Sequence, residues 1–262
     1  MRHPRALYGL IGHPVATLRS PTLFNGRLQD WVLPGSMVAF DIVPEELEVG
    51  LAGLRVMRNL VGFLVTMPHK ERLVSLLDGV TPEAKAAGAA NIVRRGADGR
   101  LFGGQLDGAG FVAAMRLSGF DPQGKRLYVA GAGGVSAGIC AALAAAGAAR
   151  IDIFNRNAER AGLLARRLGA SYPRTAIATV DGGPTVEADA VVNATSLGMR
   201  PDDALPFSLD PCRDGTFVGD VVNTAEPTPL LRAAAARGFK GQSGQAMVEP
   251  QLALMREFFA GN

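Results

Sequence analysis

A lysine, Lys70, follows directly after an apolar run that is typical of a buried strand. The run GFLVTMP (62–68) ends at Pro68, which fixes a turn and ends strand pairing. In a parallel α/β sheet, ligands bind at the carboxyl ends of the strands, and Lys70 stands at such an end. A lysine beside an acid can exchange a proton with a hydroxyl group, so acid–base chemistry is one interpretation of this position, although a surface role is more common for a lysine at a strand end. A solvated surface role is the alternative.

The acid that would serve Lys70 cannot be identified from spacing, because the pairing is spatial. The best candidate is Asp107 in GGQLDGAGF, since it lies where the character of the chain changes, among glycines that allow close approach of a ligand. His69, next to the lysine, is better explained as a solvated or helix-capping residue than as a catalytic one.

A glycine turn that begins at Gly131 has the context of a dinucleotide-binding site. Its pattern is G-x-G-G-x-S, with Ser136 in place of a third glycine, and it lies between a strand and a small-residue helix within the βαβ segment 125–156. Glycines let the backbone approach a pyrophosphate, and the helix N-terminus supplies N–H donors. A plain tight turn between strand and helix is the alternative.

The second strand of this segment ends in IDIFNR, which indicates NADP. An NAD enzyme usually has Asp or Glu here to bind the ribose 2′-hydroxyl, whereas this chain has Asn155 and Arg156, followed by Arg160. Arginine accommodates a 2′-phosphate through charge-assisted hydrogen bonds. The alternative is that both arginines are solvated surface charges.

The elements that would position these residues indicate two α/β domains joined by short connections, with the change of character near residue 105. The first part has a βαβαβ order, which implies a mostly parallel sheet covered by helices. Its expected elements are strands at 6–12, 38–43 and 62–68 and helices at 20–31, 44–57 and 69–78. The second part adds strands at 189–199 and 215–222 and helices at 225–238 and 247–261.

The bulk composition excludes several other classes. The chain has 262 residues, 48% hydrophobic and 19% charged, as expected for a globular protein with a full core. The net charge of +3, without a basic cluster among aromatics, does not favour nucleic acid as a partner. With two cysteines, no apolar run near the roughly 18 residues of a membrane span and no signal-peptide pattern, we expect a cytoplasmic protein without a membrane partner.

The chain resembles the shikimate dehydrogenase family over nearly its whole length, from GLIGHP to Gln251. Seven motifs occur in the family's order: VTMPHKE, TPEAKAAGAAN, LDGAGF, VAGAGGVSAG, NRNAER, VVNATSLGM and TPLLRAA. The resemblance implies an NADP-dependent oxidoreductase of the shikimate pathway of aromatic amino acid biosynthesis. Such an enzyme interconverts 3-dehydroshikimate and shikimate, or a related compound such as quinate, by hydride transfer.

The resemblance also implies domains and residue roles. It implies a substrate-binding and catalytic domain over 1–106, completed by the C-terminal helix 245–262, and a Rossmann-type NADP-binding domain over 107–244. Lys70 matches the catalytic lysine, and Asp107 matches the catalytic aspartate that would orient it. The substrate-binding positions are Ser20, Thr66, Asn91 and Gln251. The cofactor-binding positions are Gly131, Ala132, Gly133, Gly134, Val135, Asn155, Arg156, Arg160, Thr195, Val221 and Gly244, and no metal is implied.

Several substrate positions depart from the family pattern. The first loop has Leu18-Arg19-Ser20-Pro21 instead of Ser-x-Ser-Pro, so one of two serines that hold the substrate carboxylate is replaced. Leu64 replaces an asparagine, Gln105-Leu106 replaces Asn-Thr, and Asn223 replaces a tyrosine. A lost hydrogen bond to a carboxylate costs roughly 1.5–3 kcal/mol unless Arg19 supplies another. Shikimate, quinate and a modified ring carboxylate therefore all stay open as substrates.

A different class of function is an NADP-binding regulator that keeps the fold and has lost its substrate. The retained Lys70 and Asp107 argue against it, because a binding protein needs no proton-transfer pair. For the enzyme we expect a small cyclic hydroxy acid as partner and a monomer or homodimer.

Overall fold

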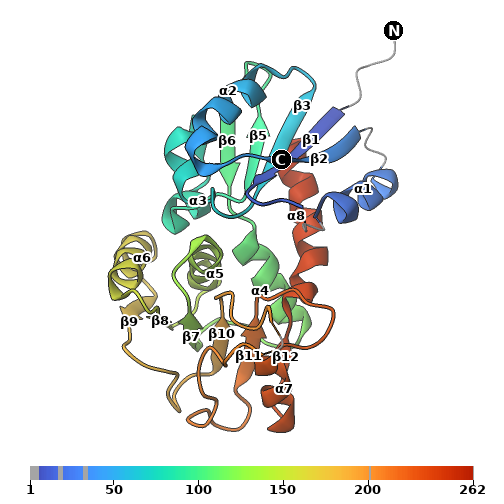
Figure 1. Cartoon of the computed structure of the whole chain (residues 1–262). Coiled ribbons are helices and arrows are strands. Elements are labelled where there is room, and N and C mark those ends of the chain that lie inside the picture. The colour runs from blue at the N-terminus through green and yellow to red at the C-terminus, as the bar shows by residue number, and fades with distance from the viewer. Residues whose placement is uncertain (1–5, 17–19, 32–34, 201, 262) are drawn as a thin grey trace. The chain divides into compact units, whose positions relative to one another are not determined.

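The computed structural model describes residues 6–16, 20–31, 35–200 and 202–261 and divides into two compact units (Figure 1). Unit 1 comprises the chain up to Leu106 and from Leu252 onward, and unit 2 comprises Asp107–Gln251. In the described residues, each unit is an α/β structure built on a six-stranded sheet. None of the helices in these ranges is long and apolar enough to cross a membrane.

The sheet of unit 1 is mixed but mostly parallel. Its strands are β1 (Ala6–Gly12), β2 (Gly35–Asp41), β3 (Leu60–Val65), β4 (Gly79–Val80), β5 (Ile92–Arg95) and β6 (Leu101–Gly104). They lie in the order β2-β1-β3-β5-β6-β4. Only β5 runs against its neighbours among these described strands, since it is antiparallel to both β3 and β6. The remaining pairs in the sheet are parallel.

Helices cover both faces of this sheet (Figure 1). They are α1 (Ser20–Asp30), α2 (Leu47–Val56), α3 (Pro82–Ala87) and the later part of α8 (Val248–Ala260), with 3-10 turns at Pro44–Glu46 and Arg72–Leu76. On one face, the leucines of α2 pack against Phe63 and Val65. On the other face, the ring of Tyr8 lies 5.1 Å from that of Phe24 and 5.2 Å from that of Phe259, measured between centroids.

The predicted helix over 69–78 is wrong, because the chain forms a turn there and then the short 3-10 helix Arg72–Leu76. The carbonyl of Lys70 accepts a hydrogen bond from the Ala90 N–H at 2.9 Å. That carbonyl is therefore bound to a distant segment, whereas an α-helix would use it for the residue four positions later. The predicted strand over 62–68 likewise ends at Val65.

The sheet of unit 2 is parallel throughout the described strands. Its strands are β7 (Arg126–Ala130), β8 (Arg150–Phe154), β9 (Ala176–Thr179), β10 (Ala190–Asn193), β11 (Phe217–Asp220) and β12 (Gly241–Gln242). They lie in the order β12-β11-β10-β7-β8-β9. Counted along the chain, this is the doubly wound order of dinucleotide-binding sheets, in which the strand order reverses between β7 and β10. The predicted strands over 189–199 and 215–222 are correspondingly shorter at both ends.

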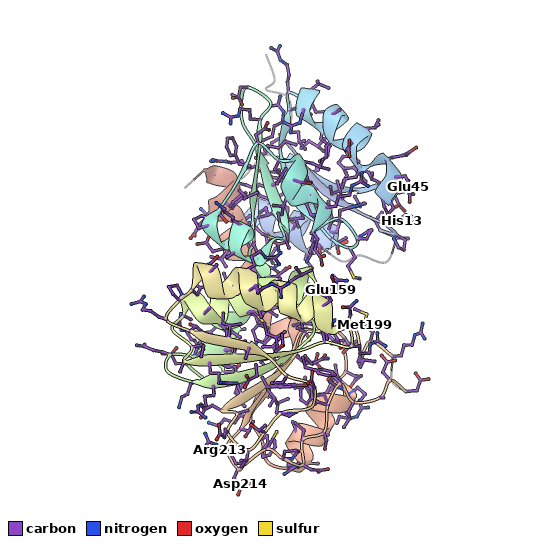
Figure 2. All side chains as sticks on the ribbon, turned by 90° about the vertical axis from the view of Figure 1, so that its left-hand side faces the viewer. His13, Glu45, Glu159, Met199, Arg213 and Asp214 are labelled. Atoms are coloured by element: carbon purple, nitrogen blue, oxygen red, sulfur yellow. The ribbon has the colours of Figure 1, made fainter. Side chains whose placement is uncertain are left out.

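Helices connect several of the strands of the unit 2 sheet. They are α4 (Asp107–Leu117), α5 (Gly134–Ala145), α6 (Ala158–Ser171) and α7 (Pro229–Ala236), with a 3-10 turn at Gly244–Met247 before α8. Helices α4 and α5 cross at glycines, since a Cβ on Gly108 would lie 1.9 Å from the Gly138 carbonyl oxygen. Figure 2 shows Glu159 and Met199 toward the carboxyl edge of unit 2, and Arg213 and Asp214 at its opposite end.

Candidate active site

Lys70 lies in the turn after β3, at the carboxyl edge of the unit 1 sheet. Its carbonyl accepts from the Ala90 N–H at 2.9 Å, and the Val65 N–H donates to the Asn91 carbonyl at 2.8 Å. These two bonds fasten the turn to the segment that leads into β5. The predicted catalytic lysine and the predicted substrate-binding Asn91 are thereby held at the same edge.

Asn91 is itself a structural junction, and its side chain is 4% exposed. Its Oδ1 accepts from the Leu106 N–H at 2.7 Å, and its backbone N–H donates to the Gly104 carbonyl at 2.9 Å. Asn91 therefore fixes the chain just before Asp107. A substrate contact by this residue would use a side chain that the fold already orients.

Thr66, a predicted substrate-binding residue, directly follows β3. Its N–H donates to the Ile11 carbonyl at 2.9 Å. Its methyl group explains Gly12, because a Cβ there would lie 2.3 Å from Thr66 Cγ2. Ser20 is the half-buried first residue of α1, whereas the loop positions Leu18 and Arg19 lie outside the described residues.

His69 is structural, and the expectation that it is solvated or caps a helix is wrong. Its side chain is 1% exposed, and Nε2 lies 2.7 Å from the Ile42 carbonyl oxygen. Because a carbonyl oxygen only accepts, Nε2 must carry the proton. The ring ties the Lys70 turn to the chain after β2.

Asp107 is the first residue of α4, and it is 6% exposed. Its Oδ1 accepts from Gln251 Nε2 at 2.8 Å. Gly110 makes room for the contact, because a Cβ there would lie 3.1 Å from Gln251 Cβ. The structure thus brings two predicted residues together, and Gln251 fixes the direction of the Asp107 carboxylate.

The glycine turn lies between β7 and α5, where the strand order of unit 2 reverses. Gly131 has a φ of 122°, and a Cβ there would lie 2.6 Å from the Ala194 carbonyl oxygen, so this position requires glycine. A Cβ on Gly133 would meet no atom within 4 Å, so the turn borders open space. The side chain of Ser136 is buried, and its Oγ donates to the Gly131 carbonyl at 2.6 Å, which explains why serine replaces a third glycine.

This turn fits a dinucleotide pyrophosphate. Helix α5 begins at Gly134 and directs its first N–H groups toward the turn, as anion sites at helix N-termini do. The other predicted residues of the turn are Ala132, which is 8% exposed, and Val135, which is half-buried.

Asn155 and Arg156 follow β8, the neighbour of β7 in the sheet. Asn155 Nδ2 donates to the Asn157 carbonyl at 2.9 Å, and Asn157 Oδ1 caps α6 by accepting from the Arg160 N–H at 3.0 Å. Arg156 is exposed, and no side chain in the described ranges pairs with it. An unpaired guanidinium next to a helix N-terminus fits the 2′-phosphate of NADP.

Thr195, Val221 and Gly244 gather at the ends of β10 and β11. The N–H and the hydroxyl of Thr195 donate to Asn193 Oδ1 at 3.1 and 2.7 Å. The Val221 N–H donates to the Asn193 carbonyl at 3.0 Å. Gly244 lies against Val221, since a Cβ there would be 2.2 Å from the Val221 carbonyl oxygen. The three predicted residues thus share one edge of the unit 2 sheet.

Two further polar residues lie at this edge, Asn193 and Asp220, and both are fully buried. Neither was predicted as a site residue from the sequence. They are the last residues of β10 and β11, and Asn193 Nδ2 donates to Asp220 Oδ1 at 3.0 Å. The signal is the polar residue that ends each apolar run, VVN and FVGD, at the edge where ligands bind.

Two family models match the chain. Residues 10–93 match the shikimate dehydrogenase substrate-binding domain, and residues 112–198 match the shikimate / quinate 5-dehydrogenase domain. Among curated proteins, the shikimate dehydrogenase (NADP(+)) of Rubrobacter xylanophilus is 40% identical over 98% of this chain and 96% of its own length.

Solved structures show the same fold. The shikimate 5-dehydrogenase of Thermus thermophilus, in complex with NADP(H) and shikimate, superposes with a TM-score of 0.87 at 32% identity, covering 98% of this chain and 94% of its own. The ligand-free 5-ketofructose reductase of Gluconobacter sp. superposes with a TM-score of 0.89 at 29% identity, covering 99% of this chain and 94% of its own.

Proposed function

This chain belongs to the shikimate dehydrogenase family, and from that premise we propose that it is an NADP-dependent oxidoreductase that interconverts 3-dehydroshikimate and shikimate. The relative from Rubrobacter xylanophilus has this activity in its name. When bound, NADP accepts or returns a hydride at its nicotinamide ring.

The proposal is supported most strongly by two features at the carboxyl edge of the unit 2 sheet. This edge combines a glycine turn at the point where the strand order reverses with an unpaired arginine after the neighbouring strand. The first feature suits a pyrophosphate and the second suits a 2′-phosphate. Together they support NADP as the cofactor.

Lys70 is the residue that we propose to move the proton of the substrate hydroxyl. Its position after β3, fixed by the Ala90 contact, supports this role. We propose that Asp107 acts with Lys70 and binds the same substrate, with Gln251 orienting its carboxylate. Ser20, Thr66 and Asn91 are proposed polar contacts to the ring substituents.

The substrate is the part of the assignment that the residues restrict least, because one loop position that would hold the carboxylate and a second position of the substrate pocket are altered. Leu18 cannot donate a hydrogen bond, and Asn223, exposed after β11, replaces a tyrosine. Quinate is the second candidate, since one family model includes it. A keto sugar is a third candidate, since a structural neighbour is a 5-ketofructose reductase.

Initial rates over a substrate panel test the proposal. The purified chain is assayed for NADP⁺ reduction with shikimate and with quinate, and for NADPH oxidation with 3-dehydroshikimate and with 5-ketofructose. We expect the largest kcat/KM for the shikimate pair. If the chain binds NADPH but turns over none of the four, the regulator that has lost its substrate becomes the better assignment.

Cofactor choice is tested with the same assay in NADP⁺ and NAD⁺. Arg156→Ala should lower kcat/KM for NADP⁺ by about ten- to hundredfold and leave that for NAD⁺ nearly unchanged, because a charge-assisted contact to the 2′-phosphate is lost. Arg166→Ala, which removes an exposed arginine farther along α6, is the matched control. Equal kcat/KM for the two cofactors in the unaltered chain would contradict the NADP assignment.

We further propose that the chain works in the cytoplasm on small molecules, as a monomer or homodimer and without a nucleic-acid or membrane partner. Both of its cysteines, Cys140 and Cys212, are buried free thiols, which suits a reducing compartment.

A further inference from the structure

We propose that Asp220 is a positioning residue that holds the loop 194–198 in place for the nicotinamide end of the cofactor, without touching cofactor or substrate. The inference rests on the proposed function, because that function makes this loop part of the NADP site. It extends that function by naming a buried carboxylate on which the hydride-transfer geometry depends.

Asp220 is fully buried and surrounded by neutral donors. Its Oδ1 accepts from Asn193 Nδ2 and from the Val222 N–H, both at 3.0 Å. Its Oδ2 accepts from the Thr228 hydroxyl at 2.7 Å. No cationic side chain in the described ranges pairs with this carboxylate, so three hydrogen bonds offset the cost of burying it.

Asn193 passes the constraint from Asp220 to the loop. Besides its bond to Asp220, Asn193 Nδ2 donates to the Leu197 carbonyl at 2.8 Å. Its Oδ1 accepts twice from Thr195, from the N–H at 3.1 Å and from the hydroxyl at 2.7 Å. The amide therefore makes four hydrogen bonds, which is all that its two donors and two lone pairs allow. Its orientation is fixed by the carboxylate on one side and the loop on the other.

The Thr195 hydroxyl is committed within the loop as well. It donates to Asn193 and accepts from the Leu197 N–H at 3.1 Å. A contribution of Thr195 to the cofactor would therefore come from its methyl group or backbone. The position of that backbone is set by Asn193.

The loop borders the glycine turn. The Ala194 carbonyl oxygen would lie 2.6 Å from a Cβ on Gly131, so the two segments meet where the strand order reverses. In sheets of this kind, a dinucleotide binds across the crevice at that point. Arg156, proposed for the 2′-phosphate, follows β8 on one side of β7, so the loop after β10, on the other side, borders the nicotinamide end. At its other end, the loop closes on Gly198, whose φ is 103° and whose Cβ would lie 3.4 Å from Thr228 Cβ.

Removing the carboxylate should release the loop at both ends. In Asp220→Ala, the amide of Asn193 loses the acceptor that holds it, and the Thr228 hydroxyl loses its partner. Asp220→Asn keeps an oxygen that can accept from Asn193 and Val222, while its new N–H₂ can donate to the Thr228 hydroxyl. The asparagine variant should therefore restore much of what the alanine variant loses.

The experiment separates the two ends of the cofactor. Titration with NADPH, followed by the fluorescence of the reduced nicotinamide, reports the environment of the ring. Titration calorimetry with adenosine 2′,5′-bisphosphate, which lacks nicotinamide, reports the Arg156 end. Single-turnover rates with NADPH and 3-dehydroshikimate report hydride transfer. The variants are Asp220→Ala, Asp220→Asn and Asn193→Ala, with Asp189→Ala as control.

The control removes a carboxylate from the opposite end of β10. Asp189 accepts from the Arg126 N–H at 2.9 Å and pairs with Arg213, so it is a structural carboxylate of the same sheet. Asp189→Ala should leave nicotinamide fluorescence and hydride transfer unchanged. A loss equal to that of Asp220→Ala would overturn the proposal, because it would show that any destabilisation of this sheet has the effect.

We expect Asp220→Ala and Asn193→Ala to lose most of the nicotinamide fluorescence change and to slow hydride transfer by about a hundredfold, since small misplacements of reacting groups have effects of that size. Affinity for adenosine 2′,5′-bisphosphate should stay within about twofold, as for independent sites. A folded Asp220→Ala with unaltered fluorescence would overturn the proposal, as would a parallel loss of adenosine 2′,5′-bisphosphate affinity. If Asp220→Ala does not fold, Asn193→Ala decides by the same criteria.

The binding readouts need no substrate. If the unaltered chain binds NADPH and turns over none of the panel, the proposed function fails while the role of Asp220 is still measured by fluorescence.

Discussion

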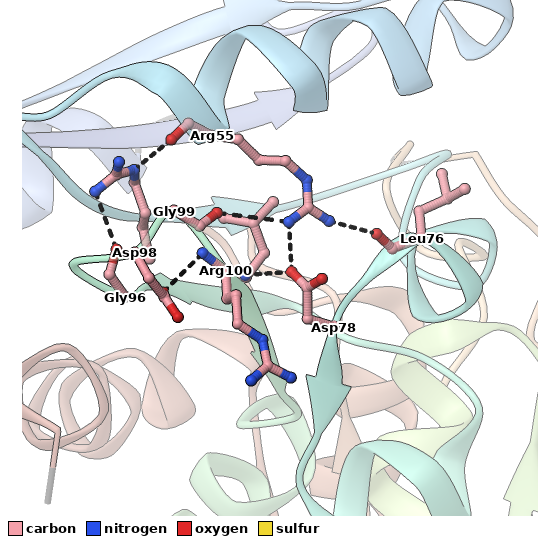
Figure 3. A network of polar contacts seen from close by, with 9 residues as sticks. Arg55, Leu76, Asp78, Gly96, Asp98, Gly99 and Arg100 are labelled. Atoms are coloured by element: carbon pink, nitrogen blue, oxygen red, sulfur yellow. Dashed lines mark hydrogen bonds and ion pairs between the residues drawn. The ribbon is translucent and has the colours of Figure 1, made fainter.

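Two carboxylates, one in each unit, are held by networks of opposite character. Asp78 in unit 1 pairs with Arg55 and accepts from the Leu101 N–H at 2.7 Å (Figure 3). Its side chain is 29% exposed, and Arg55 also donates to the Leu76 carbonyl at 3.0 Å. Asp220 in unit 2 is fully buried and bonded to neutral donors.

The two environments shift the carboxyl pKa values in opposite directions. The Leu101 N–H, and then Arg55, hold the pKa of Asp78 below its ordinary value. Burial raises the pKa of Asp220, although its hydrogen bonds with Thr228, Val222 and Asn193 oppose the shift. Asp78 accepts a hydrogen bond from the first residue of β6, away from the carboxyl end of that strand. Asp220, in contrast, is the last residue of β11 and lies at the carboxyl end of its strand. A paired carboxylate such as Asp78 can stabilise the fold through its charge. Ionising a buried carboxylate such as Asp220 costs free energy, so its presence in the interior is better explained by the segments that its hydrogen bonds hold in place.

The largest effect on stability is expected at Asp220. Asp220→Ala leaves the Asn193 amide, the Val222 N–H and the Thr228 hydroxyl without their acceptor, and should lower the free energy of unfolding by about 3–5 kcal/mol. Urea unfolding at pH 7, with the m-value checked for constancy, measures the change. A loss below about 1 kcal/mol would mean that the network relaxes freely and would remove the contrast between the two carboxylates.

The pH dependence of stability should distinguish the two sites by sign. Because the folded pKa of Asp78 is lowered, its contribution is present above the unfolded pKa of about 3.9 and is lost as pH falls through the folded pKa. Asp78→Asn should therefore be less stable than the unaltered chain at pH 7, and the difference should disappear as pH falls through the folded pKa of Asp78. For Asp220, whose folded pKa is raised, ionisation is less favourable in the folded chain, so stability falls as pH rises through the folded pKa. The hydrogen bonds to Asn193, Val222 and Thr228 remain at pH 7, and they are what Asp220→Ala removes.

Urea midpoints of the unaltered chain, Asp78→Asn and Asp220→Asn, measured from acid to neutral pH, check both signs. The comparison would fail if Asp78→Asn stayed less stable at low pH, since the stabilisation would then be independent of the charge of Asp78. Arg55→Met should reproduce only part of the Asp78→Asn profile, because it removes the cation of the pair but leaves the Leu101 N–H, which lowers the pKa of Asp78 most.

The smallest effect on stability is expected at Tyr128. Its hydroxyl is buried like the Asp220 carboxylate, but in the described part of the chain it has none of the hydrogen-bond partners that Asp220 has. Its side chain is 2% exposed, and its hydroxyl has no hydrogen-bond partner among the described residues. Burial alone raises the pKa of this phenol. Tyr128→Phe should leave stability unchanged or raise it by up to about 1 kcal/mol, because an unsatisfied hydroxyl is removed. A thermal midpoint lowered by several degrees would instead reveal a bound partner for the hydroxyl.

Local patterns in the sequence predicted the cofactor half of the fold well. The segment 125–156 gave the strand, glycine turn, helix and second strand, because one short motif encodes all four, and the structure forms β7, α5 and β8 there. The family resemblance predicted the class of fold and the class of reaction, because its short motifs occur along nearly the whole chain.

Features that depend on distant contacts could not be predicted. The short strands β5 and β6 carry too few residues for a periodic signal, and the turn at Lys70 forms because Ala90 binds its carbonyl. The Ser136 bond to Gly131 and the partnership of Asn193 with Asp220 join residues through the fold. Spacing alone does not reveal such pairs, although the polar ends of β10 and β11 were visible in the sequence.

The most direct test of the account is the turnover of Lys70→Ala with shikimate and NADP⁺, measured together with NADPH affinity. Lys85→Ala, which changes an exposed lysine on α3, is the control. If Lys70 moves the proton of the substrate hydroxyl, kcat should fall by about 10²–10⁴-fold while NADPH affinity stays unchanged. A Lys70→Ala variant that keeps more than about a tenth of the unaltered kcat would contradict that role.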